Sequence, residues 1–574
     1  MRILSRFMKP YRGRIALMFV LLLFQALGTL VIPTLMSDIV NKGILVGDTA
    51  YIRRASLVML LAAVLVAGIS IAHIYLSSDN AALIGRDIRN TVFRRTQELS
   101  VYDFNRFGTA SMITRSTNDV TQIQTGFSTI VELLLPAPFM TIAGLLLTFS
   151  KDRTLALLLI GIMALILLLA LLLSRKAIPM FDRLLAMMDE MNRGVLEKIS
   201  GVRVIRAFNR VCYEKKRMDD TFTQYGNMGI RINRLFAVLM PLITLIMNLC
   251  TLLIIWLGDS RIHSGGIALG DLYAIIEYAT ITLTFLIMGL SAIVTIPRLN
   301  ISARRIAQVL EAENSIPDTG SRRMEKEDAG ELEFRDVSFG YGDAEKSVLS
   351  HISFSVHKGQ TTAVIGSTGS GKSTILNLLM RFYDPGEGQI LLGGKDIREF
   401  PLADYRALIG YVPQKAFLFS GTIAENLRHG KENATEEDMW SAVRTAQLSE
   451  FVNGLEDGLG TRVSQGGANF SGGQRQRLAI ARAIIRKPSI YVFDDSFSAL
   501  DFKTDAMLRR ALKRETEESA VLIIAQRVST IMDAQQILVL EDGKIIGSGT
   551  HGELMEHCPV YQQIAKSQMK EETQ

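Results

Sequence analysis

The stretch Gly366-Ser-Thr-Gly-Ser-Gly-Lys-Ser373 decides the fold of the second half of this chain. It follows the apolar run 362–365 and opens a segment, 374–380, in which apolar residues recur at helical spacing. Strand, glycine-rich loop and helix in this order form a phosphate-binding loop, because glycines let backbone N–H groups surround phosphates and the helix N-terminus adds a positive dipole. The loop predicts an ATP site whose phosphate-binding residues are Gly366, Ser367, Thr368, Gly369, Ser370, Gly371, Lys372, Ser373 and Thr374.

A second apolar strand, expected at 490–494, ends in two acids, Asp494 and Asp495. A carboxylate at the end of a buried strand beside a phosphate loop suits a ligand of a Mg²⁺-bound water, so we expect Asp494 in that role. The hydroxyl of Ser373 is expected to ligate the same ion. Between the two motifs lies Asn469-Phe-Ser-Gly-Gly-Gln-Arg-Gln-Arg477.

Together these ordered motifs resemble those of the ATP-binding-cassette (ABC) family. The resemblance implies that Tyr341 stacks on adenine and that Gln414 senses Mg²⁺ and contacts the membrane part. It also implies that the stretch 469–477 is the family's signature motif and binds the nucleotide of a partner domain, and it extends to Ser498-Ala-Leu-Asp501. The residues that it adds to the ATP and Mg²⁺ site are Tyr341, Gln414, Ser471, Gly472, Gly473, Gln474 and Asp501.

Two positions depart from the family pattern. The residue after the Mg²⁺ aspartate is normally Glu, which orients or deprotonates the attacking water, whereas the carboxylate of Asp495 falls about 1–1.5 Å short. A misplacement of that size costs about a hundredfold in rate. The switch histidine is replaced by Gln526, which cannot carry a charge or a proton, and losing one acid–base group costs about 10²–10⁴ in rate. With Asp495 and Gln526 at its catalytic positions, the site is expected to bind ATP and to hydrolyse it slowly.

The signature motif, in contrast, is intact, and both sites of a homodimer would carry the same two changes. We therefore expect the degenerate-site half of a heterodimeric bacterial multidrug-type exporter. Its partner would be a different half-transporter with the catalytic Glu and the switch His. Two alternatives stay open: a homodimeric exporter in which Asp495 suffices as the catalytic carboxylate, and an ATP-gated regulatory subunit that transports nothing.

The first half of the chain is apolar enough to lie in a membrane. Of the 574 residues 48% are hydrophobic, and long apolar segments in this half are near the length that crosses about 30 Å of hydrocarbon. The expected fold is an all-α six-helix transmembrane domain (type IV ABC exporter fold) fused to an α/β P-loop nucleotide-binding domain. Its expected ranges are 1–311 for the membrane domain, 312–331 for a linker and 332–574 for the ATP domain, and its spans are 15–36, 55–76, 127–149, 155–173, 235–257 and 272–296.

Lysine and arginine gather before the first expected span and after the second and fourth. By the positive-inside rule, both termini and the ATP domain are expected on the cytoplasmic side of the cell membrane. The net charge of +6 follows from this bias and gives no reason to expect a nucleic-acid partner. The other expected partners are membrane lipid and, by family resemblance alone, a hydrophobic drug-like molecule, lipid or peptide as substrate.

Two stretches, 107–119 and 201–210, resemble the coupling regions of exporters, in which a short helix docks onto the ATP domains. Ionisable residues inside a membrane are costly and usually face a cavity or a partner. Glu277, near the start of the sixth span, is the expected substrate-contacting acid, with an interhelical hydrogen bond or a headgroup-level position as the equal alternative. Glu132 lies near one end of its span and is expected at the membrane interface.

Overall fold

The computed structural model describes residues 2–293, 295–322, 331–342, 346–498 and 500–572. The chain divides into two compact units: Met1–Gln97 with Gly108–Ala312, and Glu98–Phe107 with Glu313–Gln574. Residues 323–330 of the expected linker lie outside the described residues, as does Ala499 of the motif that ends at Asp501.

Within the described residues of the first unit, six helical segments are long and apolar enough to cross a membrane, so the predicted number of spans is confirmed. Each contains between 40 and 53 residues. About 20 residues suffice to cross the hydrocarbon layer, so every segment continues well beyond it. The six segments are Ser5–Ile44, Thr49–Glu98, Thr109–Lys151, Arg153–Ser200, Val211–His263 and Leu269–Leu310.

Among the described residues of this unit are two π-helical segments: η2 (Ile39–Ile44) ends the segment Ser5–Ile44, and η3 (Ile130–Leu134) lies within the segment Thr109–Lys151. The α-helices are α1 (Arg2–Met8), α2 (Arg12–Asp38), α3 (Thr49–Glu98), α5 (Thr109–Ser116), α6 (Asn118–Thr129), α7 (Pro136–Lys151), α8 (Arg153–Ser200), α9 (Val202–Ala207), α10 (Val211–His263), α11 (Leu269–Ile293) and α12 (Thr295–Leu310).

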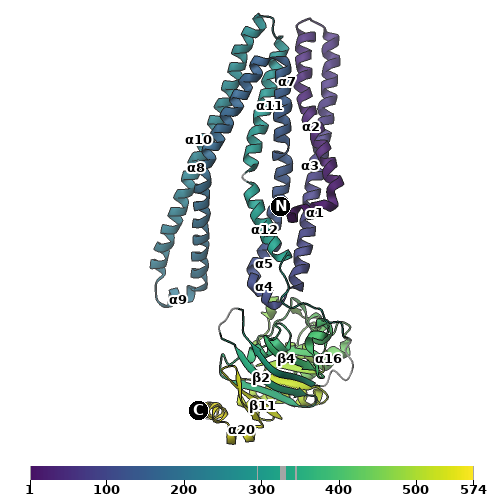
Figure 1. Ribbon diagram of the computed structural model, residues 1–574, viewed down its shortest axis with the longest axis vertical. Helices are drawn as coiled ribbons and strands as arrows, with labels where there is room; N and C mark the ends of the chain where they lie inside the picture. Colours follow the sequence, from purple (N-terminus) through teal and green to yellow (C-terminus); the bar gives the residue numbers. More distant parts are fainter. Residues whose placement is uncertain (1, 294, 323–330, 343–345, 499, 573–574) are drawn as a thin grey trace. The chain divides into compact units, whose positions relative to one another are not determined.

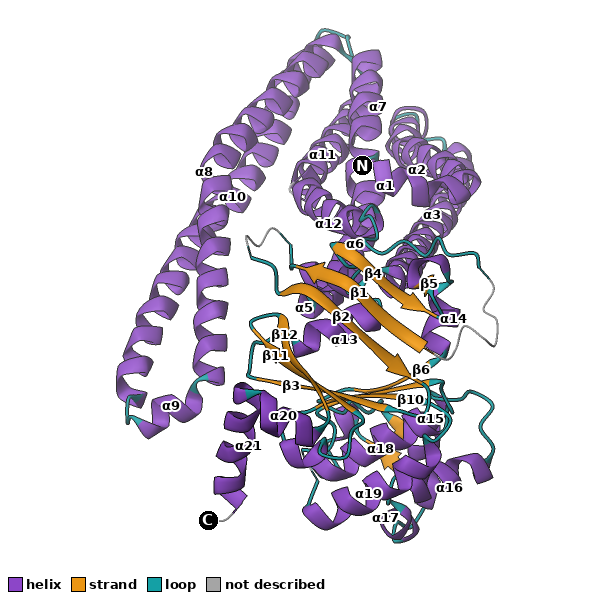
Figure 2. Ribbon diagram, turned by 60° about the horizontal axis from the view of Figure 1, so that its bottom comes forward, coloured by secondary structure: helices purple, strands orange, loops and turns teal. Residues whose placement is uncertain are grey.

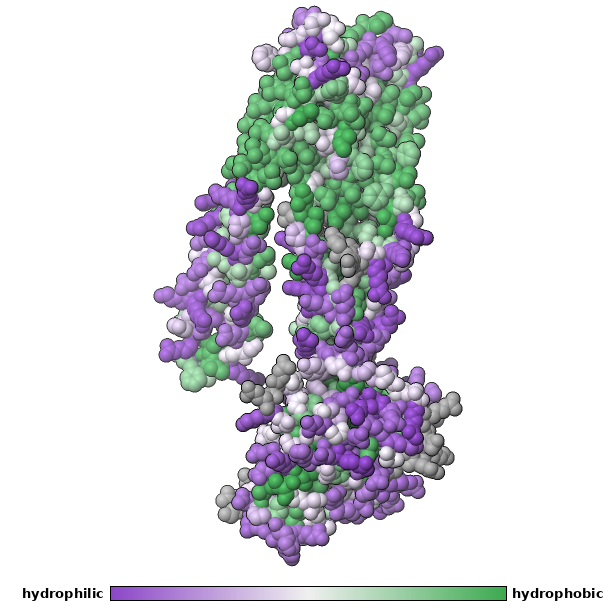
Figure 3. All heavy atoms as spheres, in the orientation of Figure 1, coloured by the Kyte–Doolittle hydropathy of each residue, from purple (hydrophilic) through white to green (hydrophobic). Residues whose placement is uncertain are grey.

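Helices α2, α7 and α11 pack together, whereas α8 and α10 run side by side as a long pair (Figure 1). Gly144 allows the close approach of α7 to α11, because a Cβ atom there would lie 2.0 Å from Oγ1 of Thr282. Small residues commonly serve this purpose between membrane helices. On the face shown in Figure 3, hydrophobic side chains cover most of the upper part of the helical unit, and polar side chains predominate in its lower part.

The second unit contains two main sheets. The six-stranded sheet has the order β12-β11-β3-β10-β9-β6 and is parallel except for the β11–β12 pair. The four-stranded sheet, β2-β1-β4-β5, is antiparallel. The strands are β1 (Glu331–Phe339), β2 (Leu349–His357), β3 (Thr361–Gly366), β4 (Glu387–Leu392), β5 (Lys395–Asp396), β6 (Ile409–Val412), β7 (Gly421–Thr422), β8 (Arg462–Val463), β9 (Ile490–Asp494), β10 (Ala520–Ile524), β11 (Gln536–Glu541) and β12 (Lys544–Gly549).

Helices cover both faces of the six-stranded sheet, which explains why all of β10 is buried. Helix α13 (Lys372–Leu379) packs into the core between the two sheets. Helices α18 (Gly472–Ile484) and α19 (Phe502–Glu515) lie on the opposite face (Figure 2). The other helices of this unit are α4 (Val101–Phe107), α14 (Leu402–Ala407), α15 (Ile423–Arg428), α16 (Glu436–Thr445), α17 (Ser449–Asn453), α20 (His551–His557) and α21 (Pro559–Glu572).

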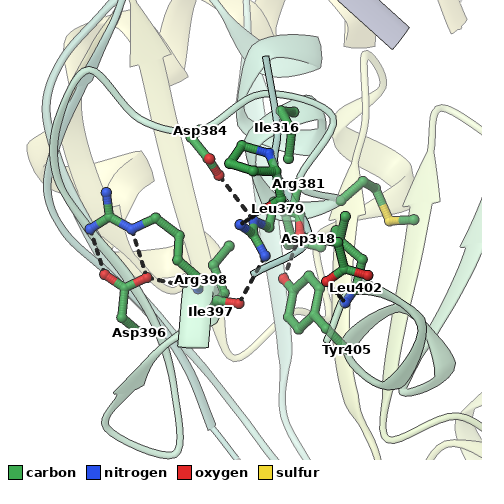
Figure 4. A network of polar contacts seen from close by, with 12 residues as sticks. Ile316, Asp318, Leu379, Arg381, Asp384, Asp396, Ile397, Arg398, Leu402 and Tyr405 are labelled. Atoms are coloured by element: carbon green, nitrogen blue, oxygen red, sulfur yellow. Dashed lines mark hydrogen bonds and ion pairs between the residues drawn. The ribbon is translucent and has the colours of Figure 1, made fainter. Parts of the chain in front are cut away.

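Part of the expected linker is bound to the second unit through a polar network around Arg381 (Figure 4). The guanidinium group of Arg381, whose residue is only 2% exposed, donates to Asp384 over 3.1 Å and to the carbonyl oxygen of Pro317 over 3.4 Å. Asp318 accepts a 2.9 Å hydrogen bond from the backbone of Leu402. These contacts attach residues 317 and 318 to the sheet-containing unit, and a buried arginine keeps its hydrogen bonds satisfied.

Candidate ATP site

The glycine-rich loop has the strand–loop–helix geometry that the sequence predicts. Strand β3 ends at Gly366 and α13 begins at Lys372. Gly371, the N-cap of α13, has a φ of 102°, which glycine adopts without the strain of a side chain. At Gly366, a Cβ atom would lie 2.1 Å from the carbonyl oxygen of Leu540. Glycine is therefore required at both ends of the loop, and the N–H groups at the start of α13 point to an anion site there.

Lys372 lies folded over this loop. Its Nζ donates hydrogen bonds to the carbonyl oxygens of Gly366 and Ser367 over 2.8 and 2.7 Å. Burial lowers the pKa of Lys372, and the nearby carboxylates of Asp495 and Asp494 oppose that shift. The lysine therefore lies within the electrostatic reach of Asp494, which ends β9, and of Asp495, which follows it.

Tyr341 is fixed beside the helix that starts at the loop. Its hydroxyl shares a 3.2 Å hydrogen bond with Thr374 and accepts a 3.1 Å hydrogen bond from Asn377, both on α13. The ring makes edge-to-face contacts with Phe339 and Tyr383, at centroid separations of 5.0 and 5.1 Å. Such aromatic pairs hold a ring in a defined orientation, so Tyr341 is pre-positioned next to the phosphate-binding helix.

Asp494, Asp495 and Gln414 come together at the end of β9. Asp494 is the last residue of that strand, and Asp495 follows it with a φ of 44°. Burial and the charge of Asp495 raise the pKa of Asp494, while a backbone hydrogen bond from Gln414 acts against this shift. The side-chain amide of Gln414 donates to Oδ2 of Asp495 over 3.2 Å. A left-handed φ at a residue other than glycine is uncommon and is enriched at functional sites.

Gln526 leaves the sheet near these residues. It follows β10, which lies between β3 and β9 in the parallel part of the sheet. The carboxyl ends of parallel strands meet at one edge, so Gln526 emerges at the edge that carries the phosphate loop and Asp494. The side chain of Gln526 is exposed and makes no hydrogen bond to any residue that the structure describes, whereas its backbone carbonyl oxygen accepts from Gln568 over 2.6 Å.

The signature motif begins helix α18. Ser471 is its N-cap: Oγ accepts a 3.3 Å hydrogen bond from the backbone N–H of Gln474, whose side chain accepts a 2.8 Å hydrogen bond from the backbone of Ser471. Ser471 and Gly472 are exposed. The signature thus presents an accessible, capped helix N-terminus, which is a surface suited to an anionic group.

Two further contacts lie at or beside residues of the predicted set. The side chain of Gln476 on α18 donates to the carbonyl oxygen of Pro413 over 3.1 Å and so ties the signature helix to the loop of Gln414. Asp501 is the N-cap of α19 and accepts a 2.9 Å hydrogen bond from the backbone of Thr504, which lowers the pKa of Asp501.

Glu277 belongs to the helical unit, where it is half-buried and forms no hydrogen bond or ion pair with the described residues.

The residues of this site suit ATP with Mg²⁺. No group of three or more acidic, histidine or cysteine side chains that could hold a metal ion occurs within the described ranges. Mg²⁺ is commonly bound by one or two protein oxygens together with water and substrate phosphates. The exposed hydroxyl of Ser373, the side chain of Gln414 and the carboxylate of Asp494 would hold the ion in that way.

Sequence reasoning missed one element, helix α4. This helix directly precedes the stretch that resembles a coupling region, and it belongs to the unit of the ATP site. The ring of Tyr102 on α4 makes an edge-to-face contact with Tyr383, at 6.0 Å between centroids, and Tyr383 in turn contacts Tyr341. A chain of three aromatic rings thus links α4 to the residue expected to stack on adenine.

Asp103 connects α4 to the segment around Ser315, which follows the helical unit in the sequence. Its residue is 7% exposed, and its carboxylate accepts hydrogen bonds from the hydroxyls of Ser100 and Ser315 over 2.5 and 2.6 Å. Burial opposes ionisation of Asp103, but these hydrogen bonds prevail and lower its pKa. The signal that could have identified α4 is the Tyr-Asp pair at 102–103, which places an aromatic residue and an acid between basic segments.

The fold and the site define a membrane-spanning P-loop ATPase, and the comparisons with known proteins identify its family. The profile of the ABC transporter transmembrane region matches residues 15–286, and the ABC transporter profile matches residues 349–498. An uncharacterized ABC transporter ATP-binding protein of Mycobacterium tuberculosis is 38% identical over 99% of this chain and 98% of its own length. The chain belongs to the ABC transporter family.

Two other proteins extend this comparison. YheH of Bacillus subtilis, named as a probable multidrug resistance ABC transporter, is 32% identical over 84% of this chain and 72% of its own length. A bacterial Atm1-family ABC exporter solved with ATP bound has a similar fold, with a TM-score of 0.79 and 24% identity over 96% of this chain and 97% of that one. The chain therefore has the type IV ABC exporter fold and is a half-transporter, with a transmembrane region and an ATPase domain in one polypeptide.

Proposed function

We propose that this half-transporter pairs with a different ABC subunit and contributes the slower of two ATP sites to a heterodimeric exporter. The observation that carries the proposal is the contrast between two parts of one ATP unit. The water-activating positions hold Asp495 and Gln526, whereas the signature at Ser471 is intact and capped. A homodimer would repeat the two substitutions in both sites.

The geometry around Asp495 supports slow hydrolysis. Its carboxylate accepts from the amide of Gln414 over 3.2 Å. The side chain of aspartate is one methylene shorter than that of glutamate. Its carboxylate is therefore expected to lie about 1–1.5 Å farther from the attacking water than a glutamate carboxylate would. The exposed Gln526 can donate a hydrogen bond but cannot shuttle a proton. The short side chain of Asp495 and the missing acid–base group at Gln526 would both slow the attack of water on ATP.

The signature supports a role in the partner's site. In this family, each nucleotide lies between the phosphate loop of one subunit and the signature of the other. The α18 N-terminus, with Ser471 and Gly472 exposed, is available to complete a site on another chain. The fast site of the complex would then combine the partner's catalytic Glu and switch His with Ser471, Gly472, Gly473 and Gln474 of this chain.

Each residue of the slow site would contact a different part of bound ATP and Mg²⁺. Bound ATP with Mg²⁺ supplies the energy that closes the two ATP domains. Lys372 and the loop backbone neutralise phosphate charge, Tyr341 positions adenine, and Asp494 fixes the ion through water. Closure turns the pathway outward, hydrolysis at the partner's site resets it, and Gln414 relays the change toward the membrane part.

The proposed location is the cell membrane, with both termini and the ATP unit in the cytoplasm. The proposed substrate class is hydrophobic or amphipathic, including drugs, lipids and peptides, and the name of YheH supports a multidrug role. Glu277 is the proposed substrate-contacting acid of the sixth span, and its carboxylate has no partner within the described part of the chain.

The proposal is tested by single-turnover analysis of nucleotide bound to this chain in lipid. Labelled ATP is bound without excess nucleotide, and the bound fraction is recovered at intervals. We expect most of it to return as ATP after a time in which a competent ABC site completes many turnovers. Rapid recovery as ADP would reject the slow site and favour a homodimer that uses Asp495.

A further inference from the structure

A cavity lies within the helical unit, away from the ATP site. It has a volume of about 230 Å³ and is lined by residues of α2, α3, η3, α7 and α11. Leucine, isoleucine, alanine, proline, methionine and phenylalanine side chains form most of its wall, and Gln25, Thr29, His73 and Glu132 also line it. A largely apolar pocket with a few convergent polar groups is typical of small-molecule sites.

Two polar atoms of residues that line this cavity have no hydrogen-bond partner among the described residues. Nε2 of His73, whose residue is 2% exposed, and Oε1 of Gln25 are both buried without a hydrogen-bond partner among the described residues. Thr29 donates its own hydroxyl proton to the carbonyl oxygen of Gln25 over 2.8 Å, so its oxygen can only accept from a further group. Buried polar groups without partners are costly, and here they converge on one cavity.

Glu132 gives the cavity its charge. It lies on the π-helical segment η3 and accepts a 3.2 Å hydrogen bond from Ser77 on α3. No lysine or arginine is among the described residues that line the cavity. A half-buried carboxylate with only a neutral donor needs a cation or a proton to offset its charge. π-Helical segments are rare and are frequently found at functional sites.

Buried polar side chains extend along one face of α3 from His73. His73, Ser77 and Asn80 follow at helical spacing and are each at most 2% exposed. The side-chain amide of Asn80 has neither its donor nor its acceptor paired among the described residues. The polar character is therefore a property of one helix face and is not confined to a single side chain.

We propose that this cavity binds a small organic ammonium ion with an apolar body. Glu132 would accept its N–H group, and the apolar wall would enclose the hydrocarbon part. The volume is several times the roughly 30 Å³ share of one water, so a bare metal ion would leave most of the cavity unfilled. The site is independent of the proposed slow ATP site, and it would stand if this chain hydrolysed ATP rapidly.

The test compares two probes of matched shape on the full chain in lipid nanodiscs. The first is 1-naphthylmethylamine, which is an ammonium ion at about pH 7, and the second is neutral 1-naphthylmethanol. Binding is measured by equilibrium dialysis against protein-free nanodiscs of the same composition. We expect saturable binding of the amine and at least about tenfold weaker binding of the alcohol, since hydrogen bonds to charged groups are the stronger ones.

Two variants, Glu132→Gln and Glu277→Gln, test where the amine binds. Glu132→Gln keeps the size of the side chain and removes its charge, so it should weaken amine binding about tenfold or more and leave binding of the alcohol unchanged. ATP binding serves as the control for folding of each variant. Equal binding of amine and alcohol, unaltered amine binding in Glu132→Gln, or loss of amine binding in Glu277→Gln alone would each overturn the proposal. No amine binding above the protein-free nanodiscs would overturn it as well, and would leave a proton as the partner of Glu132.

Discussion

The side-chain amide of Gln414 donates a hydrogen bond to Oδ2 of Asp495 over 3.2 Å. This contact joins the residue expected to sense Mg²⁺ to the residue at the water-activating position. It also fixes the carboxylate relative to the end of β9, where Asp494 lies. The length of the side chain at position 495 therefore decides how far the carboxylate reaches toward a bound nucleotide.

Lengthening the side chain at position 495 should raise ATP turnover only slightly. Asp495→Glu is expected to raise ATP turnover by less than about tenfold, because Gln526 still lacks an acid–base group worth about 10²–10⁴ in rate. The double variant Asp495→Glu with Gln526→His should gain far more. Steady-state phosphate release checks both, with Asp495→Asn as the matched inactive control. Near-complete recovery from the single change would mean that position 526 matters less than we infer.

Ser471→Asp separates the fold of the signature from its proposed role in a partner's site. Aspartate caps a helix as well as serine does, so α18 and the midpoint of thermal unfolding should be unchanged. Its charge, however, repels a phosphate at the α18 N-terminus, and we expect the complete complex to lose at least about tenfold in turnover. ATP binding by this chain alone should be retained. Unchanged turnover of the complex would contradict the composite site.

Asp494→Asn should stabilise the ATP unit while it weakens Mg²⁺-dependent binding. The pKa of Asp494 is raised by burial and by Asp495, so the folded state holds the proton more tightly than the unfolded state. Stability then falls as pH rises from about 3.9 through the folded pKa, and the cost persists at neutral pH. We expect the variant to melt about 2 °C or more higher at neutral pH, with the difference vanishing below about pH 4. A lower melting temperature at neutral pH would contradict the raised pKa.

Asp103→Asn should have the opposite effect, because hydrogen bonds lower the pKa of Asp103 despite its burial. Its contribution to stability is present above the unfolded pKa of about 3.9 and is lost as pH falls through the lower folded pKa. We expect a loss of about 1–2 kcal/mol at neutral pH, since hydrogen bonds to a carboxylate are among the stronger ones. Asp404→Asn, at an exposed carboxylate on α14, is the control. Equal melting of both variants would show that Asp103 is not an anchor.

The sequence was sufficient for the elements that depend on local patterns. The six apolar segments and the strand–loop–helix around Lys372 are confirmed, because length, hydropathy and glycine placement act over short stretches. The contact between Tyr102 and Tyr383 joins residues far apart in the chain, and no local pattern signals it. The same limit applies to the cavity beside Glu132, because its wall comes from several helices and no local pattern signals it; the interfacial position of Glu132 stays a prediction. The heterodimer stays a proposal, because one chain carries only half of each site.

The most direct test of the proposed slow site is steady-state ATP hydrolysis by this chain purified alone in lipid, with ATP binding measured on the same sample. We expect ATP to bind through Lys372 and the phosphate loop while turnover stays about a hundredfold or more below that of the complex with its partner. Turnover of the isolated chain equal to that of a competent ABC exporter would contradict the account and assign the catalytic carboxylate of a homodimer to Asp495.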